Sequence, residues 1–285
     1  MTTRLAIVFV ALLALAGCGG GGGGGPSDGD VQTGTGSQTP QETVADISAR
    51  LPGLLSRTDS LVVSTWYGET DNAALPTFRA RSSCSGTVCT VHEPQTGLSA
   101  TVDLDDFSWD TSRTRALLTK HDITVLETRT DTGRDYSSVM DHSAFAIEND
   151  RRVIDGVTVW SRLSSAGGDL TRSRPTGTAT WTGIMVGVPS GTAGRNNFLQ
   201  GDAALTYDFS GSLDARFTSI RNITRNQPHS VTSVRFDDIP VSSRGTFQAG
   251  GTGNRIQGGF YGRGHAETAG VFEQQGIVGS FGAKK

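Results

Sequence analysis

Alternation between apolar and polar residues dominates the second half of the chain. Between Leu199 and Phe209 every second residue is apolar or small, and the residues between them are mostly polar. This period of two predicts a strand with one buried face and one wet face. The alternation resumes over residues 213–217, directly after Ser210-Gly211, so the two runs together predict a hairpin.

Further strand-like runs surround this hairpin, at residues 178–188, 231–239, 244–248, 254–261, 267–273 and 277–282. Short antiparallel strands in this number predict an eight-stranded antiparallel up-and-down barrel, which removes the exposed edges of an open sheet. A barrel of this size holds little beyond its own side chains. We therefore expect a solid interior, with binding left to the loops and the outer wall. The rings expected inside are Phe209, Phe217, Phe236, Phe260, Phe272 and Phe281.

The first half of the chain has a mixed pattern. Thr39 to Glu42 has the composition of a capping box, and apolar residues then recur at helical spacing over 44–55, so a helix is expected to begin near Thr39 and to be kinked or shortened at Pro52. Strand-like runs follow at 61–67, 87–92, 98–104, 123–128, 143–147 and 157–163. We predict a mainly β protein, in which a small helix-plus-antiparallel-sheet domain (39–165) and a linker (166–175) precede the barrel domain (176–285).

The first 38 residues belong to neither domain. Arg4 precedes an apolar run over residues 5–16, which is too short to span a bilayer and is typical of a secretory signal peptide. Leu15-Ala-Gly-Cys18 resembles the lipobox of bacterial lipoproteins. The resemblance implies that residues 1–17 are removed and that Cys18 becomes an acylated N-terminus on a flexible Gly-rich tether (18–38). The alternative is an ordinary signal peptide with a nearby cysteine.

The residue after Cys18 bears on the membrane. Gly19 stands where an Asp commonly retains such lipoproteins at the inner membrane, so by analogy the outer membrane is favoured. Lipid-anchored proteins of the outer membrane are either surface-exposed or periplasm-facing, and the sequence is compatible with both locations.

The two other cysteines form an even pair. In Cys84-Ser-Gly-Thr-Val-Cys89 the Ser-Gly supplies a turn, so the thiols can face each other across a tight hairpin in an oxidising compartment. A disulfide is expected, acting as a local staple because the loop that it closes is short. A metal or redox pair is the alternative, and it would need further ligands that the sequence does not supply at zinc-like spacing.

Charge and composition narrow the function classes. The chain has 25 Lys and Arg against 28 Asp and Glu, with no long run of like charges, so neither nucleic acid nor an anionic membrane surface is expected as a partner. The five histidines are scattered, and neither a Gly-x-Ser-x-Gly elbow nor a His-Glu-x-x-His pair is present. We therefore expect a protein that is not an enzyme, and the sequence implies no cofactor or metal.

The segment from Gly258 to Lys285 carries the most specific motif. It resembles the end of the barrel domain of transferrin-binding protein B and its relatives, which are bacterial outer-membrane lipoproteins. Arg263 and Ala269 depart from the Pro and Gly usual in that family. The matching positions are Phe260, Tyr261, Gly262, Glu267, Gly270, Phe272, Phe281, Gly282, Ala283 and Lys284.

The resemblance covers about residues 176–285 and implies one barrel, whereas a full transferrin-binding receptor has two lobes. It favours a non-enzymatic outer-membrane lipoprotein whose barrel captures a host protein or an iron or haem source; the alternative is a structural or envelope-organising lipoprotein without a soluble ligand. His142 and Tyr261 are weak candidates for haem ligands. The candidate contact segments are 191–197, 221–230 and 249–253, with Trp66, Tyr67 and Trp109 as candidate anchors in the first domain.

Overall fold

A computed structural model describes residues 43–55, 60–71, 77–85, 88–92, 99–103, 112–154 and 156–285. The predictions for the signal peptide, Cys18, the tether, the cap at Thr39 and Trp109 lie outside the described residues. In the part of the chain that is described, no helix is long and apolar enough to cross a membrane.

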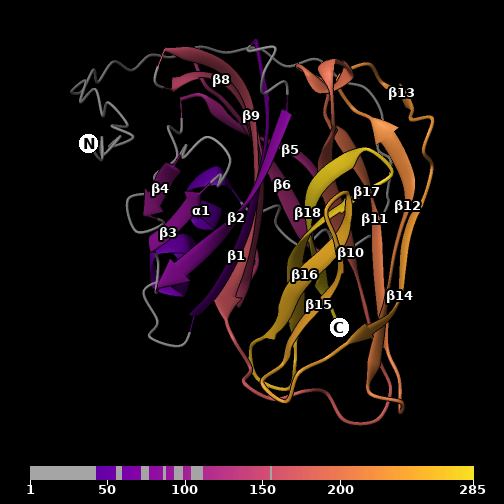
Figure 1. Cartoon of the computed structure of the whole chain (residues 1–285). Coiled ribbons are helices and arrows are strands. Elements are labelled where there is room, and N and C mark those ends of the chain that lie inside the picture. The colour runs from indigo at the N-terminus through magenta and orange to yellow at the C-terminus, as the bar shows by residue number, and fades with distance from the viewer. Residues whose placement is uncertain are drawn as a thin grey trace, which may run out of the picture.

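Strands from the first half of the chain form a nine-stranded antiparallel sheet, in the order β4-β3-β2-β1-β9-β8-β7-β6-β5. We call it the N-terminal sheet (Figure 1, indigo to rose). Its strands are β1 (Ser60–Thr70), β2 (Thr77–Ser85), β3 (Val88–His92), β4 (Ser99–Asp103), β5 (Thr114–Lys120), β6 (Ile123–Arg129), β7 (Gly133–Val139), β8 (Ser143–Ile154) and β9 (Val157–Asp169). The prediction of a helix beside an antiparallel sheet is therefore confirmed.

The helix α1 (Val44–Leu55) begins later than predicted. Thr43 is its N-cap, because the Asp46 amide donates to Thr43 Oγ1 at 3.2 Å and the Asp46 carboxylate accepts from the Thr43 amide at 3.0 Å. The helix passes through Pro52 and ends at Leu55. Buried Ile47 and Leu54 lie on its apolar face and pack against the N-terminal sheet.

Three strands of the N-terminal sheet, β2, β5 and β7, have too many polar residues to be predicted from alternation. In addition, β9 extends to Asp169, four residues into the predicted linker. The run of small residues there is part of a central strand between β1 and β8. At Gly168 a Cβ atom would lie 2.2 Å from the His142 carbonyl, so the glycine is needed for close strand packing and does not mark a linker.

The second half forms another nine-stranded antiparallel sheet, the C-terminal sheet (Figure 1, orange to yellow). The order is β13-β12-β11-β10-β18-β17-β16-β15, and β14 pairs with β12. All eight predicted strands are present, and the two-residue β13 is additional. The strands are β10 (Ala179–Pro189), β11 (Leu199–Tyr207), β12 (Ser212–Asn222), β13 (Gln227–Pro228), β14 (Val234–Pro240), β15 (Thr246–Gly251), β16 (Asn254–Tyr261), β17 (Glu267–Gln274) and β18 (Ile277–Lys284).

The ladder of paired strands does not close into the continuous barrel that was predicted. Within residues 156–285, the seam between β14 and β15 has one isolated bridge, between Phe247 of β15 and Val241, the residue after β14. Further along the same seam a side chain replaces strand pairing. The Arg235 amide donates to Gln274 Oε1 at 3.2 Å, and Gln274 Nε2 donates to the Arg235 carbonyl at 3.0 Å.

The interior of the C-terminal sheet is solid, as predicted. One cluster of buried side chains includes Trp181 and residues from each of the long strands, and the Phe217 and Phe272 rings stack with centroids 4.5 Å apart. Five of the six expected phenylalanines lie in this cluster. Phe209 is the exception and is 85% exposed, because β11 ends at Tyr207 and Phe209 belongs to the following turn.

The two sheets share an apolar interface, in which Phe145 and Ile147 of β8 pack with Ile184 of β10 and Val271 of β17. Helix α1 covers the opposite face of the N-terminal sheet (Figure 1). The outer side of β10 and β17 is thereby covered, whereas the outer side chains of β11, β12 and β14 alternate with buried ones and remain exposed.

Candidate functional site

Loops at one end of the C-terminal sheet contact one another and form the candidate binding surface. We call it the η2 end, after the short helix η2 (Thr192–Gly194), and define it as residues 190–198, 222–233, 251–254 and 275–276. The Ser190 amide donates to the Gly276 carbonyl at 2.6 Å, and Asn222 Nδ2 donates to Asn197 Oδ1 at 3.2 Å. All three loops proposed from the sequence (191–197, 221–230 and 249–253) lie at this end.

The 191–197 loop is less free than the sequence suggested. Asn149 Nδ2 of β8 donates to the Gly194 carbonyl at 3.2 Å, and Arg162 Nη2 of β9 donates to the Gly191 carbonyl at 3.0 Å. A Cβ atom at Gly194 would lie 1.7 Å from the Pro189 carbonyl, so only glycine fits this turn. The loop is docked on the N-terminal sheet, and it positions the η2 end more than it presents a contact surface.

Below this loop lies a buried ion pair. The Arg162 side chain is 0% exposed, and its Nη1 donates to Glu69 Oε1 at 3.0 Å. Arg195 reaches the other oxygen of Glu69 at 3.4 Å, and its guanidinium stacks on the Trp160 ring, with 3.4 Å between Cζ and the ring centroid. The pair therefore ties β1 and β9 to the loop between β10 and β11.

Two of the predicted anchors lie inside the protein. Tyr67 is 4% exposed and its hydroxyl accepts from the Gly191 amide at 3.1 Å, while Trp66 is 3% exposed and donates through Nε1 to Ser161 at 2.7 Å. Burial, followed by the Glu69 charge, raises the pKa of Tyr67. The prediction that these two rings are contact anchors is wrong. Strand β1 lies between β2 and β9 in the sheet, and both faces of β1 are buried.

The 221–230 loop is exposed and held in shape by its own hydrogen bonds. Asn222 Oδ1 accepts from the Arg225 amide at 2.9 Å, and Arg221 Nη2 donates to Asn226 Oδ1 at 3.1 Å. The neighbouring 249–253 turn is also largely exposed. Together the two segments present arginine, amide and hydroxyl groups on ordered backbone, which suits polar recognition of a large partner.

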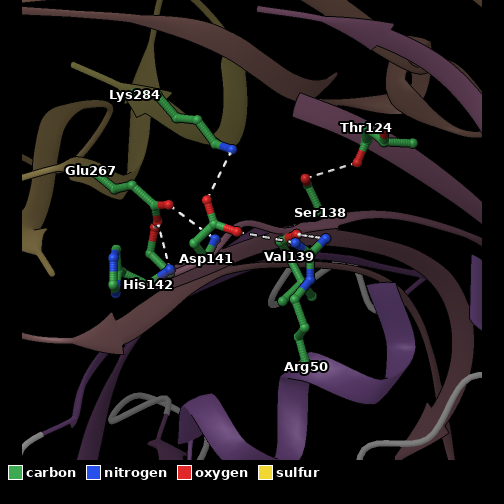
Figure 2. Close-up of polar contacts among 9 residues, drawn as sticks. Arg50, Thr124, Ser138, Val139, Asp141, His142, Glu267 and Lys284 are labelled. Atoms are coloured by element: carbon green, nitrogen blue, oxygen red, sulfur yellow. Dashed lines mark hydrogen bonds and ion pairs between the residues drawn. The ribbon is translucent and has the colours of Figure 1, made fainter. Parts of the chain in front are cut away.

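The family-motif residue Glu267 connects the two sheets (Figure 2). Its carboxylate is 2% exposed and accepts from the Asp141 amide at 2.9 Å, the His142 amide at 3.1 Å and Ser143 Oγ at 2.7 Å. Burial raises its pKa, although these donors oppose the shift. The motif glutamate therefore fixes the turn between β7 and β8 on the C-terminal sheet.

An exposed ion-pair network surrounds this contact. Lys284 Nζ lies 3.3 Å from one Asp141 oxygen, and Arg50 of α1 lies 3.2 Å from the other (Figure 2). Arg50 also donates to the Val139 carbonyl at 3.1 Å. The turn between β7 and β8 is thus contacted by Lys284, the last residue of β18, and by helix α1 on the far side of the N-terminal sheet.

The remaining motif residues pack. Phe260, Phe272 and Phe281 fill the interior of the C-terminal sheet, and a Cβ atom at Gly270 would lie 2.8 Å from the Phe281 ring. Gly282 makes similar room for the Phe145 ring, at 2.5 Å. Gly262 has a φ of +74°, and a Cβ atom there would lie 2.3 Å from the His142 ring. In this chain, these motif residues therefore serve to pack the strands and the two sheets together.

Neither haem-ligand candidate gains support. Tyr261 is 0% exposed in the interface between the sheets, and burial raises the pKa of its hydroxyl, which has no hydrogen-bond partner among the described residues. His142 Nδ1 is likewise buried. Of the other histidines, His121 lies 3.8 Å from Asp202, His229 accepts from the Val231 amide and His265 contacts Ser173, so these side chains occupy separate places.

One carboxylate cluster stands out among the described residues. Asp135, Glu148 and Asp150 each place an oxygen within 4.8 Å of the others. Arg152 already occupies this cluster, with Nη2 at 2.6 Å from Glu148 and 3.2 Å from Asp150. We describe it as an ion-pair network on β7 and β8. Burial and the charges of Glu148 and Asp150 raise the pKa of Asp135 well above its usual range.

Asp135→Asn is expected to stabilise the protein by about 1 kcal/mol at pH 8. The folded pKa of Asp135 lies above its unfolded value, so stability falls as pH rises from about 4 through the folded pKa, and the amide removes that loss. Urea denaturation at pH 5 and pH 8 measures the difference, which should be smaller at pH 5. A loss of stability at pH 8 would show that Asp135 is stabilised as an anion.

The predicted cysteine pair has matching backbone positions. Cys84 of β2 is directly opposite Cys89 of β3 in the antiparallel register. Opposed residues in such a pair have Cα atoms about 4.5–5.5 Å apart, which is within the range that a disulfide spans.

A scan against protein-family models and a search of curated proteins give no match. The structure is similar to solved structures of transferrin binding protein B from Haemophilus parasuis Hp5 (13% identity, TM-score 0.38, 78% of this chain and 44% of that chain) and of isotype 1 from serogroup B Neisseria meningitidis (14%, 0.37, 78% and 43%). It is also similar to the N-lobe domain of lactoferrin binding protein B of Moraxella bovis (12%, 0.33, 80% and 99%). The chain spans less than half the length of those two transferrin-binding proteins.

Proposed function

We propose that this chain is a non-enzymatic binding lipoprotein, anchored to the outer membrane through Cys18, that presents its η2 end to a protein partner. The observation that carries the proposal is the exposed, hydrogen-bonded 221–230 loop at the end of a solid sheet. Loops on a rigid scaffold are the usual place for recognition. The Cys18 lipobox and the Gly-rich tether support a position at the membrane surface.

A protein partner fits this surface better than a small iron or haem ligand does. The interior of the C-terminal sheet is filled by aromatic rings, so it offers no room for a planar ligand. Tyr261 is enclosed between the sheets. The arginine, amide and hydroxyl groups of the 221–230 loop spread over an exposed surface instead. Transferrin and lactoferrin, for which the similar structures are named, are the first partners to test.

Partner capture tests the proposal. The acyl-free protein, immobilised, should retain a partner from host serum or secretions at micromolar concentration. The triple variant Arg221→Ala, Arg225→Ala and Gln227→Ala should bind it about 10- to 100-fold more weakly, because a few arginines often dominate such interfaces. The control is Arg151→Ala, Arg216→Ala and Gln248→Ala, which removes the same side chains from other exposed faces. Equal loss in both variants, or no partner at all, would contradict the proposal.

The anchor has a separate test. Cys18→Ser should abolish incorporation of a labelled fatty acid and release the protein from the membrane fraction.

Protease added to intact cells then distinguishes the two faces of the outer membrane. Digestion is expected for a surface-exposed binding protein, whereas protection would favour the envelope-organising alternative.

We also propose that Cys84 and Cys89 are joined in the mature protein. Their opposed register supports the bond. Cys84→Ser should lower the free energy of unfolding by about 2 kcal/mol, because the loop that the bond closes is short. Alkylation followed by mass spectrometry, with and without a reductant, measures the oxidation state, and two alkylated thiols before reduction would refute the bond.

A further inference from the structure

Four loops that are far apart in the sequence meet at the other end of the C-terminal sheet. We call this the Phe209 end and define it as residues 170–178, 208–211, 241–245 and 262–266 together with Lys285. His265 Nε2 lies 2.8 Å from the Ser173 carbonyl, and a Cβ atom at Gly245 would lie 2.4 Å from the same oxygen. Lys285 Nζ donates to the Gly264 carbonyl at 3.5 Å. These contacts make the loops one continuous surface.

The Phe209 end is strongly basic. It carries five exposed cationic side chains, and its loops contribute one carboxylate, Asp208. Asp208 accepts from the Ser210 amide at 2.9 Å, and the Ser210 hydroxyl is the largest cause that lowers its pKa, so Asp208 contributes one negative charge against the five cations. The whole chain, by contrast, has a net charge of -3. The exposed cations are Arg172, Arg174, Arg244, Arg263 and Lys285.

An apolar side chain projects from the same surface. Phe209 is 85% exposed at the tip of the β11–β12 turn, and it is the most exposed large apolar side chain among the described residues. It adjoins the basic loops, because its ring lies 3.9 Å from where a Cβ atom at Gly177 would be, and Arg174 Nη1 lies 3.6 Å from the corresponding point at Gly211. The exposed ring offers apolar area that an apolar surface can bury.

We propose that the Phe209 end docks on an anionic lipid surface, with Phe209 in the interfacial region and the arginines at the headgroup phosphates. Positive charge combined with an exposed aromatic tip is the pattern of interfacial membrane binding. Guanidinium groups bind phosphate in a bidentate manner, and here they stand on three separate loops of the same end of the sheet. A nucleic acid would use the charges and leave Phe209 without a role.

Docking would also set the orientation of the molecule. The strands of the C-terminal sheet run from the Phe209 end to the η2 end, so the two ends face opposite ways (Figure 1). With the Phe209 end on the membrane, the η2 end points outward. The inference thus goes beyond the proposed function, and it holds or fails independently of acylation at Cys18 and of the identity of any partner.

Vesicle binding tests the inference. The chain from Gly19 to Lys285, which has no acyl chain and contains every described residue, is sedimented with vesicles of phosphatidylcholine alone or with phosphatidylglycerol added. Partition onto the anionic vesicles should be at least tenfold stronger and should fall at high salt, where charges are screened. Each cation near such a surface contributes about fivefold, so Arg174→Gln, Arg244→Gln and Arg263→Gln together should weaken binding about a hundredfold. Phe209→Ser alone should weaken it about tenfold.

A charge-matched variant separates this surface from general attraction. Arg129→Gln, Arg151→Gln and Arg216→Gln remove three exposed arginines from other faces and should leave partition within about threefold of the parent protein. All the substituted side chains are exposed, so thermal unfolding should confirm that each variant folds. Equal binding to both vesicle types, equal loss in the two triple variants, or binding to DNA or an acidic protein but not to vesicles would overturn the inference.

Discussion

Arg162→Met is expected to lower the free energy of unfolding by about 3–5 kcal/mol, the range seen when one partner of a buried ion pair is removed. The substitution leaves the buried Glu69 carboxylate without its 3.0 Å partner and the Gly191 carbonyl without its donor. Arg195 remains at 3.4 Å and compensates in part. Methionine keeps the length of the stem, so the loss reports on the charge and the hydrogen bonds. Urea denaturation followed by tryptophan fluorescence measures it.

Two further variants sharpen this test. Arg195→Met removes the partly exposed partner and should cost about 1 kcal/mol, mostly through the lost stacking on Trp160. The double variant Glu69→Met and Arg162→Met should be more stable than Arg162→Met alone, because no unpaired buried charge remains. A cost under about 1 kcal/mol for Arg162→Met would show that the pair does not hold the 191–197 loop on the N-terminal sheet.

Glu267→Ala is expected to cost about 3 kcal/mol, because it leaves two backbone amides and the Ser143 hydroxyl without an acceptor. The effect should depend on pH. The folded pKa of Glu267 lies above its unfolded value, so the folded state binds the proton more tightly and the carboxyl contributes most at low pH. The stability difference between parent and variant should therefore shrink as pH rises from about 4 through the folded pKa.

A matched control for Glu267 lies in the same turn. Asp141 is mostly exposed, at 59%, and pairs with Arg50 and Lys284 in water, so Asp141→Ala should cost less than about 1 kcal/mol. Denaturation midpoints at several pH values between 4 and 8 give both comparisons. A pH-independent loss for Glu267→Ala, or a loss equal to that of Asp141→Ala, would contradict the assigned role.

The sequence predicted β11 and β12 well because these two strands have one wet face. The alternation of β11 and β12 and the phenylalanines of β12, β16, β17 and β18 survive in the structure as strands and core. Phe209 fits the alternation but lies two residues beyond Tyr207, where β11 ends, so its predicted burial was wrong. A period of two cannot show where a strand ends, and in this case Asp208 begins the turn through its bonds to Ser210.

The N-terminal sheet was harder because charged side chains are buried in it. Glu69 and Arg162 lie on strands yet are less than about a tenth exposed, because they pair across strands β1 and β9. Such residues break the apolar pattern, and their partners are far apart in the sequence. Separation along the sequence is also why the Phe209 end was not predicted. The arginines at 172, 174, 244 and 263 form no run in the sequence, and the fold alone brings them together.

The side chain of Gln274 has a consequence for how these molecules behave when crowded. A seam between two strands exposes backbone donors and acceptors, which invite a strand from a neighbouring molecule. At Arg235 both groups are already bound by the Gln274 amide. A neighbouring chain would have to displace that amide before it could add a strand there, so Gln274 protects this position against edge-to-edge association at high protein concentration.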